Sequence, residues 1–536
     1  MIPQPDQQLA DALASEAQFV RITAEPSLQD RARSVALVRR ALGAGQGGKA
    51  IPLLAALNCK LPVDAEIVTL HGVALRLEQR LVEAAAVFAA ARAGGLGDPA
   101  VLQGLAQTRY ELGLPATTLF AEAQRVTPGN FELLRNHAAV MASEGDRTGA
   151  IHLLLATLRT NPGWLDGHKV LAALRWTGGD TQGFAASYAD AVRAEPGNAA
   201  LWLAWFSAVA QTQDWEQARA IIAEAEAHLG ATAAIHSAEL FIACEGDDPA
   251  RADALLAKTA HISGDTINLC RIRHDLRQHR FEAARDLILP LLDGASAGLF
   301  WPYASLAWRL LGDARAQWLD RPEVTIQSRA IGLDASEMAE LGEILRALHT
   351  MEQPYAEQTV RGGTQTDRSI MLRHEPILQR TRAAWLEVIQ ANIADLPGPE
   401  AGHPFLCQAR SQLLLGGSWS VRLRAGGHNV PHTHPIGWMS SSLYIAIPNE
   451  AVRGPAPAGH ISFGTPPPEL GLNLATYCSI VPEPGLVVTF PSMMWHAVEP
   501  FVEGERLMIA LDIRPPQFLI SQFGFRFPVY KRLHLV

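Results

Sequence analysis

Three histidines in the C-terminal part of the chain have the types and spacing that could hold one metal ion. His432 and His434 are separated by a single residue, and in an extended chain residues two apart project to the same face. His496 follows sixty-two residues after His434, after a Pro-Gly turn and an apolar run that would deliver it from a neighbouring strand. Imidazole suits iron, copper, nickel or zinc, and three protein ligands leave open positions for substrate and dioxygen. The spacing therefore predicts a mononuclear metal site.

A fourth side chain, Arg506, lies ten residues after His496 on the strand that follows. A guanidinium there can bind a carboxylate through two parallel hydrogen bonds. The histidine pair alone is weak support for a metal, because a lone histidine on a strand more often packs in a core or faces solvent. The order of the motifs strengthens the prediction, since the pair is followed by Gly459–Phe463, Pro484–His496 and Gly504–Arg506.

Short strands and flanking helices must position these side chains. From about residue 400 onward, β-rich runs separated by Gly and Pro predict an all-β sandwich or barrel. The preceding stretch predicts two helices, Glu337–Met351 and Pro376–Asp395, around an irregular segment, Arg361–Thr366. These helices would buttress one sheet of the barrel. The predicted strands are Ser418–Leu423, Ser441–Ile447, His460–Phe463, Leu486–Phe490 and Leu507–Ile513.

The N-terminal part of the chain follows a different pattern, with apolar residues at helical spacing and short breaks. Pro-Gly pairs begin at positions 128, 162 and 196, so both gaps are 34 residues. That length fits two antiparallel helices and their turns, repeated as a solenoid. Small and large apolar residues recur at matching positions of the three units: Ala138, Ala150 and Leu154; Ala172, Phe184 and Tyr188; Phe206, Ala218 and Ile222.

This pattern resembles the tetratricopeptide repeat family over roughly residues 30–300. The resemblance implies a concave surface that binds a peptide or protein, because stacked repeats commonly leave a groove. The alternative is a purely structural or dimerising solenoid, and we therefore keep a homodimer among the expectations.

Composition argues against several classes of protein. The net charge of −9 disfavours a nucleic-acid or anionic-membrane binder, since such proteins need a basic face. The apolar stretches fall short of the ~20 residues of a membrane helix, and the polar N-terminus lacks the pattern of a secretory signal. Five scattered cysteines without a Cys-x-x-Cys pair support neither a zinc finger nor a disulfide framework. A reducing, cytoplasmic setting is the simplest expectation.

The C-terminal motifs resemble the 2-oxoglutarate/Fe(II)-dependent oxygenases over about residues 335–515, and most closely bacterial members with an N-terminal tetratricopeptide region. The resemblance implies that His432, His434 and His496 hold Fe(II), and that Arg506 binds the distal carboxylate of 2-oxoglutarate, with dioxygen as the other co-substrate. The matching stretches are Arg361–Thr366, Gly417–Leu423, His432–Ser440, Pro484–Gly485, Phe490–Ser492 and His496.

The same resemblance assigns Tyr444, with Ser440 four residues before it, to the position of a co-substrate-binding tyrosine in prolyl-hydroxylase-like members. It also implies a double-stranded β-helix (jelly-roll) with flanking helices as the catalytic fold. The resulting domain prediction is an all-α tetratricopeptide-like solenoid at 1–320, a linker with buttressing helices at 321–400, and the β-helix core at 401–536.

One position departs from the family pattern, because His434 stands where these oxygenases usually carry Asp. A neutral third ligand leaves more positive charge at the metal, so a three-histidine dioxygenase that does not use oxoglutarate stays an alternative. A cupin is disfavoured, because Trp438 and Met439 occupy the positions where cupins usually carry Glu. The leading hypothesis is an oxygenase that hydroxylates or otherwise oxidises a peptide or protein recruited by the repeats. A non-catalytic repeat scaffold with a metal- or oxoglutarate-sensing barrel is the other alternative.

Overall fold

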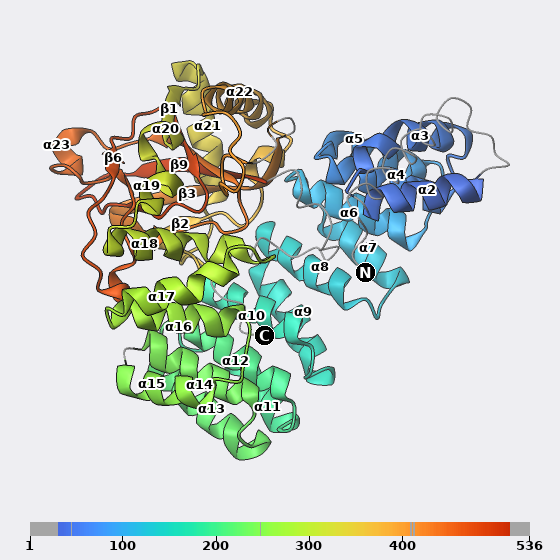
Figure 1. Ribbon diagram of the computed structural model, residues 1–536. Coiled ribbons are helices and arrows are strands. Elements are labelled where there is room, and N and C mark those ends of the chain that lie inside the picture. Colours follow the sequence, from blue (N-terminus) through green and yellow to red (C-terminus); the bar gives the residue numbers. More distant parts are fainter. Residues whose placement is uncertain (1–30, 44, 247, 408–409, 411–412, 515–536) are drawn as a thin grey trace. The chain divides into compact units, whose positions relative to one another are not determined.

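The computed structural model describes residues 31–43, 45–246, 248–407, 410 and 413–514 (Figure 1). It divides into two compact units, and each is described by itself. Among the described residues, the first contains those up to Ala150 together with Leu372–Glu375, and the second contains Ile151–Met371 and those from Pro376 to Arg514. Residues 1–30 and 515–536, which the sequence assigned to the solenoid and the β-helix, lie outside the described part.

The first unit is a stack of antiparallel helices. Tight contacts require small residues between them: a Cβ added to Gly72 would lie 2.1 Å from the ring of Phe88 on the next helix. Ala84 and Phe88 are fully buried in this core. The helices are α2 (Arg31–Gly43), α3 (Gly47–Lys60), α4 (Ala65–Leu77), α5 (Leu81–Ala93), α6 (Pro99–Glu111), α7 (Thr117–Val126) and α8 (Phe131–Ser143), and α9 (Arg147–Thr160) crosses into the second unit.

The Pro-Gly pairs lie in turns between helices, as the 34-residue period predicts. In each turn a backbone N–H bonds to the carbonyl three residues earlier: Asn130 to Thr127 at 3.1 Å, Trp164 to Asn161 at 3.1 Å, and Asn198 to Glu195 at 3.0 Å. The nine recurring apolar positions named above are all buried. The predicted helical solenoid is therefore confirmed, and the Pro-Gly pairs set its repeat length.

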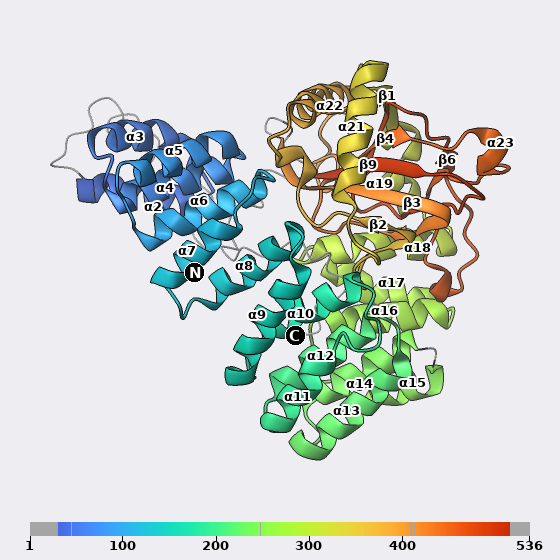
Figure 2. The ribbon, with the colours of Figure 1, turned by 180° about the vertical axis from the view of Figure 1, so that it is seen from behind.

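The second unit begins with antiparallel helices of its own, and the last helices before the sheet are shorter (Figures 1 and 2). Its helices before the sheet are α10 (Leu165–Thr177), α11 (Ala186–Ala194), α12 (Ala199–Ala210), α13 (Trp215–Leu229), α14 (Ala233–Glu245), α15 (Pro249–Lys258), α16 (Asp265–Arg277), α17 (Phe281–Ile288), η2 (Leu289–Leu291), η3 (Ala297–Leu299), α18 (Trp301–Leu311), α19 (Arg315–Asp320) and α20 (Pro322–Thr325).

The remainder of the second unit is a curled antiparallel sheet with the order β1-β7-β4-β9-β3-β8-β5-β6, and β2 pairs with β3 beside this path. The long strand β3 joins its two halves, because its first part pairs with β9 and its last part with β8. This is the predicted jelly-roll. The strands are β1 (Gln327–Ala330), β2 (Val360–Gln365), β3 (Leu414–His432), β4 (Met439–Ala446), β5 (Ile461–Phe463), β6 (Cys478–Ile480), β7 (Leu486–Pro491), β8 (His496–Val498) and β9 (Arg506–Arg514).

Two helices, α21 (Ala335–Leu348) and α22 (Pro376–Ala394), lie against the sheet near β1 and β4 (Figure 2). The α22 side chain of Trp385 donates to Ser441 Oγ at 2.9 Å, which ties the helix to β4. The prediction of buttressing helices is thus confirmed. The prediction of an irregular segment between them was wrong, because Val360–Gln365 forms β2. Three short elements complete this part: η4 (Ile370–Leu372), α23 (Glu450–Arg453) and η5 (Pro468–Leu470).

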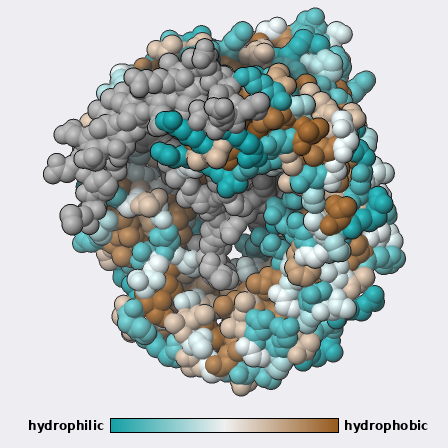
Figure 3. Space-filling model, turned by 90° about the vertical axis from the view of Figure 1, so that its right-hand side faces the viewer, coloured by the Kyte–Doolittle hydropathy of each residue, from teal (hydrophilic) through white to brown (hydrophobic). Residues whose placement is uncertain are grey.

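The surface mixes polar and apolar residues. On the face shown in Figure 3, hydrophobic residues occur in small groups among hydrophilic ones. Among the described residues, no helix is both long enough and apolar enough to cross a membrane.

Candidate active site

The three histidines meet where the two halves of the sheet join. His432 ends β3 and pairs in register with His496, the first residue of β8, while His434 lies two residues beyond the strand. A backbone bond from His434 N to Ser492 O at 2.7 Å holds that residue against the loop before β8. One ring nitrogen from each histidine lies within 4.8 Å of those of the other two. The structure therefore brings together all three ligands predicted from the sequence.

Each imidazole is oriented by an oxygen on its Nδ1 side. His432 Nδ1 lies 2.8 Å from Val430 O, His496 Nδ1 lies 3.0 Å from Met494 O, and His434 Nδ1 lies 2.8 Å from Asp512 Oδ1. A carbonyl or carboxylate oxygen accepts only, so each Nδ1 carries the proton and each Nε2 keeps its lone pair. Metal-binding histidines in proteins are held in this way. The donor set thus fits a divalent ion such as Fe(II).

Asp512 is a part of the site that the sequence reading missed. Its carboxylate accepts from His434 and also from Ser440 Oγ, at 2.6 Å, and Ser440 Oγ lies 2.9 Å from Ser492 Oγ. The available signal was a single acidic residue inside the apolar strand run Leu507–Ile513. Ser440, which the resemblance assigns to the co-substrate site, has its hydroxyl hydrogen-bonded to Asp512 and Ser492.

Two aromatic rings lie against the histidines. The Phe490 ring centroid lies 4.7 Å from that of His496, and the Trp419 ring lies 5.5 Å from that of His434. Burial, helped by the neighbouring His434, lowers the pKa of His496 to about 3. This imidazole is therefore neutral at physiological pH and can donate its lone pair to a metal.

Arg506 is fully buried at the start of β9. Arg506, Met508 and Asp512 share one face of that strand, since alternate residues point to the same side. Met508 belongs to the core inside the barrel, so Arg506 and Asp512 both face the interior. The Arg506 guanidinium carbon lies 5.0 Å from the centroid of the Tyr444 ring. The structure therefore places both sequence-predicted residues together in the same interior.

The guanidinium of Arg506 lacks an acidic partner within the described residues. Its Nη1 donates to Met508 Sδ at 3.1 Å, and its Nε and Nη2 meet no acceptor there. Burial lowers the pKa of this guanidinium and raises that of the Tyr444 hydroxyl. Buried donors without acceptors are costly and rare. A bound carboxylate would satisfy them, so the residues present fit a dicarboxylate whose far end reaches Arg506.

The last helices of the repeat stack hold the loops that carry two of the histidines. Trp495, next to His496, donates from Nε1 to Pro302 O of α18 at 3.0 Å, and its ring packs edge-on against Tyr303. A Cβ added to Gly298 of η3 would lie 2.4 Å from Pro435 O, directly after His434. These contacts were not predictable from the sequence, because a repeat pattern does not indicate which helix packs against the barrel.

Comparison with known proteins gives one family match. Residues 417–512 match the family model described as "Putative 2OG-Fe(II) oxygenase". No protein of curated function matches the chain.

Solved structures with partial similarity include three of interest. A tetratricopeptide repeat protein from Parabacteroides merdae is 16% identical, covering 45% of this chain and 99% of its own, with a TM-score of 0.30. A Pseudomonas putida prolyl-4-hydroxylase is 18% identical, covering 36% and 93%, with a TM-score of 0.26. A prolyl hydroxylase from Trichoplax adhaerens, in complex with a hypoxia inducible factor peptide fragment, is 15% identical, covering 40% and 97%, with a TM-score of 0.27.

The family match covers β3 to β9, the strands that carry the histidines and Arg506. Residues 417–512 are thus similar to the 2OG-Fe(II) oxygenases, a family whose members use Fe(II) and 2-oxoglutarate, and they follow a helical region with the 34-residue period of a tetratricopeptide-like solenoid.

Proposed function

We propose that the chain is a dioxygenase that hydroxylates or otherwise oxidises a peptide or protein substrate recruited by the repeats. The observation that carries this proposal is the buried Arg506, whose unsatisfied donors face the same interior as the histidines. An enzyme without a dicarboxylate co-substrate has no use for a buried cation there. This disfavours the three-histidine alternative, and the complete set of histidines disfavours a scaffold that only senses its ligands.

In this proposal, His432, His434 and His496 hold Fe(II) through Nε2. Arg506 binds the distal carboxylate of 2-oxoglutarate, and Tyr444 stands beside it. When bound together, these groups and dioxygen supply an oxidant strong enough to break a C–H bond. The protein orients them: Val430, Met494 and Asp512 fix the imidazole rings, and Phe490 and Trp419 exclude water from the centre.

The neutral His434 in place of a carboxylate is compensated by Asp512 behind it. An ionised carboxylate that accepts the Nδ1 proton increases the electron density of the imidazole. The negative charge that a carboxylate ligand would place on the metal therefore lies on Asp512, behind the His434 ring. Ser440 donates to that carboxylate, so in this proposal it also orients the site, beside the co-substrate position that the resemblance gives it.

The test is oxoglutarate binding. The full chain loaded with Fe(II) is titrated anaerobically with 2-oxoglutarate, and succinate release is measured in air with candidate peptides. Leaving a carboxylate without its buried guanidinium costs roughly 2–5 kcal/mol, so Arg506→Ala should weaken oxoglutarate binding at least ~30-fold. Arg506→Lys should recover only part, because a point charge does not reproduce the planar fork.

Iron binding should survive in both variants, and Arg193→Ala, which changes an exposed arginine of α11, should behave as the parent. If the parent does not bind oxoglutarate, or Arg506→Ala binds it equally tightly, the three-histidine dioxygenase becomes the better hypothesis. Cytoplasmic location, homodimer formation and the boundaries at 320 and 400 stay predictions from the sequence.

A further inference from the structure

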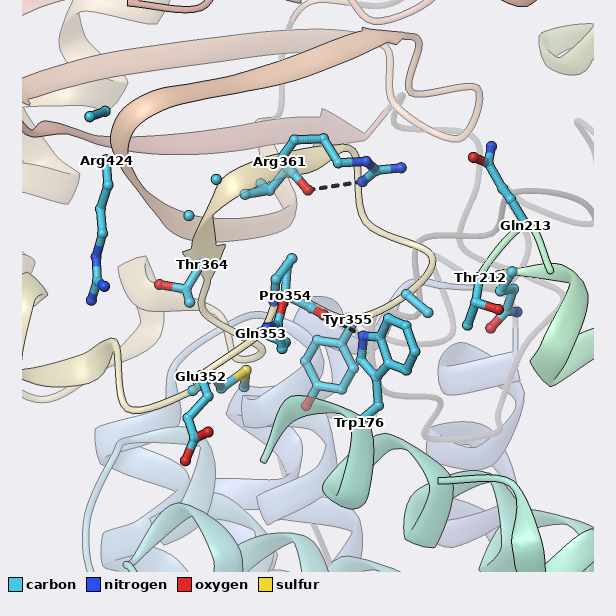
Figure 4. Close-up of a pocket in the computed structure, with 17 residues that line it drawn as sticks. Trp176, Thr212, Gln213, Glu352, Gln353, Pro354, Tyr355, Arg361, Thr364 and Arg424 are labelled. Carbon is cyan, nitrogen blue, oxygen red and sulfur yellow. Dashed lines mark hydrogen bonds between the residues drawn. The ribbon is translucent and has the colours of Figure 1, made fainter. Parts of the chain in front are cut away.

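In the second unit, helices before the sheet contact the barrel at the end of α10 and again along α18. At the end of α10, Trp176 donates from Nε1 to Pro354 O at 2.9 Å, beside a cleft of about 740 Å³ (Figure 4). The described residues that line this cleft include neither the three histidines nor Arg506. The contact along α18, in contrast, reaches Trp495, the residue directly before His496. It therefore leads more directly to the candidate metal site.

Arg309 of α18 holds both ends of the β5–β6 loop (Gly464–Tyr477). Its Nη1 donates to Gly464 O at 2.6 Å, and its Nη2 donates to Ala475 O at 2.5 Å. Its guanidinium carbon also lies 4.1 Å from the centroid of the Tyr477 ring, a cation–π contact. Because a guanidinium presents its donors in a rigid planar fork, this one side chain sets the separation of the two loop ends.

The backbone of Gly464 connects this contact to the metal site. Its carbonyl accepts from Arg309, and its N–H donates to Trp495 O at 2.7 Å. Phe463, directly before Gly464, pairs in register with His496. His496 therefore follows a residue whose backbone oxygen is held by Gly464, which Arg309 holds in turn.

The close approach at Gly464 requires a glycine. Its φ is +84°, in the left-handed region, and an added Cβ would lie 2.5 Å from the Tyr477 ring. The Tyr477 backbone N–H donates to Phe463 O at 2.8 Å, which closes the loop beside β5. Because tightly packed groups cannot move independently, a shift of Arg309 would move Gly464 and its bond to Trp495 as well.

The middle of the same loop has a separate anchor on α16. The Glu469 carboxylate accepts from Arg273 Nη2 at 3.3 Å, and the Glu469 backbone carbonyl accepts from Arg277 Nε at 2.8 Å. Glu469 lies five residues after Gly464. The middle and the end of the loop can therefore be perturbed separately.

We propose that Arg309 is a positioning residue for His496, so that a helix outside the barrel helps to set the geometry of the metal site. This rests on the role of the three histidines as ligands in the proposed function, and adds a residue to it that acts through Gly464 and Trp495. A metal ligand must be held within roughly 0.5 Å of its productive position. A displaced Trp495 backbone should therefore weaken metal binding.

The test is anaerobic titration of the metal-free full chain with Co(II), followed by visible absorption. Arg309→Gln should bind Co(II) about tenfold more weakly, at the lower end of the range for groups that orient a metal-bound histidine. The spectrum per bound Co(II) should also change, because the His496 ring takes another orientation. A variant that was only less stable would contain less folded protein but keep the parent's spectrum.

Two control variants separate this role from general loosening of the structure. Arg315→Gln removes an arginine of α19 that pairs with Asp313 and lies 4.8 Å from the centroid of the Trp308 ring, so it loses an ion pair and a cation–π contact within the helices. Glu469→Gln weakens the anchor in the middle of the loop. Both should bind Co(II) as the parent does. An equal loss in either control would overturn the proposal, and so would the parent's affinity and spectrum in Arg309→Gln.

Arg309→Lys is the second variant, and it decides the matter if circular dichroism shows that Arg309→Gln is not folded. A lysine keeps the positive charge but not the planar fork. Arg309→Lys should therefore lose part of the Co(II) affinity. An affinity equal to that of the parent would contradict the need for the fork at the two loop ends.

Amide hydrogen exchange of the metal-free chain gives a readout that does not depend on the metal. Exchange of the Gly464 N–H, which Trp495 O protects, should be faster in Arg309→Gln than in the parent, and unchanged exchange would refute the link. A parent that binds neither Co(II) nor Fe(II) would refute the proposed function and this role together. A parent that binds both metals, but no more tightly than Arg309→Gln does, would refute the role of Arg309 alone.

Discussion

The substitution Asp512→Asn tests the carboxylate behind His434. In the structure both Asp512 oxygens accept from His434 Nδ1, at 2.8 and 3.0 Å, and Oδ1 also accepts from Ser440 Oγ at 2.6 Å. An asparagine of the same shape offers one acceptor oxygen in place of two, and its amide nitrogen must donate. Either His434 or Ser440 then meets a donor, so the ring loses its fixed orientation or its proton moves to Nε2.

The expected loss of metal affinity follows from the role of the contact. Removing a group that orients a metal-bound histidine typically costs 10–100-fold in metal affinity, equivalent to about 1.4–2.7 kcal/mol. We expect the upper part of this range, because a side chain holds His434, whereas the Val430 O and Met494 O atoms beside His432 and His496 are backbone atoms that substitution leaves in place.

The assay is anaerobic titration of the metal-free full chain with Co(II), followed by its visible absorption, and repeated with Fe(II) by calorimetry. Asp190→Asn serves as the control, because it removes the same charge from an exposed position on α11. Circular dichroism establishes that each variant is folded. If Asp512→Asn binds both metals as tightly as the parent, Asp512 does not hold His434 for metal binding.

Three further predictions rest on other contacts. Tyr444→Phe should weaken oxoglutarate binding less than Arg506→Ala does, since it removes one neutral hydroxyl; anaerobic titration measures both. Gly298→Ala should lower Fe(II) affinity by roughly tenfold, because its new Cβ would displace Pro435 O beside His434, whereas Gly294→Ala should not. Burial lowers the pKa of His349 to about 4, so between about pH 6.5 and 4 the unfolded chain binds a proton that the folded chain does not. The folded state therefore loses stability as the pH is lowered through this range. His349→Gln should remove about 2 kcal/mol of the decrease in unfolding free energy between pH 7 and 5, which urea unfolding measures at both pH values. An unchanged pH dependence would contradict the lowered pKa of His349.

The histidine set and most strands were predictable because their signals are local. Apolar runs of strand length stand between Gly and Pro, and the ligands stand at the ends of two of these runs. Strand β2 was missed because Gly362 and Gly363 read as a break in any local pattern. The structure explains why a glycine is needed here, since a Cβ on Gly363 would lie 2.3 Å from Arg422 O. The glycines permit a close approach to β3, which only the folded chain reveals.

The side chains around the ligands were less predictable. The family resemblance places Ser440 at the co-substrate site, and no local pattern indicates that its hydroxyl donates to Asp512, seventy-two residues away in the sequence. A carboxylate inside an apolar strand indicates a hydrogen-bond partner elsewhere in the fold, because burying a carboxylate without a partner is costly.

The solenoid and the barrel share structure at two points that both lead to the histidines. The end of α10 fixes the loop before β2, and β2 pairs with β3, which ends in His432. Helix α18 and the loop of Trp495 share one apolar core, and Trp495 precedes His496. Because packed elements move together rather than bend, a peptide that shifts α10 would also shift β3. In the proposed function, a substrate captured by the repeats would therefore affect the geometry of the three histidines through strands and helices that are already in contact.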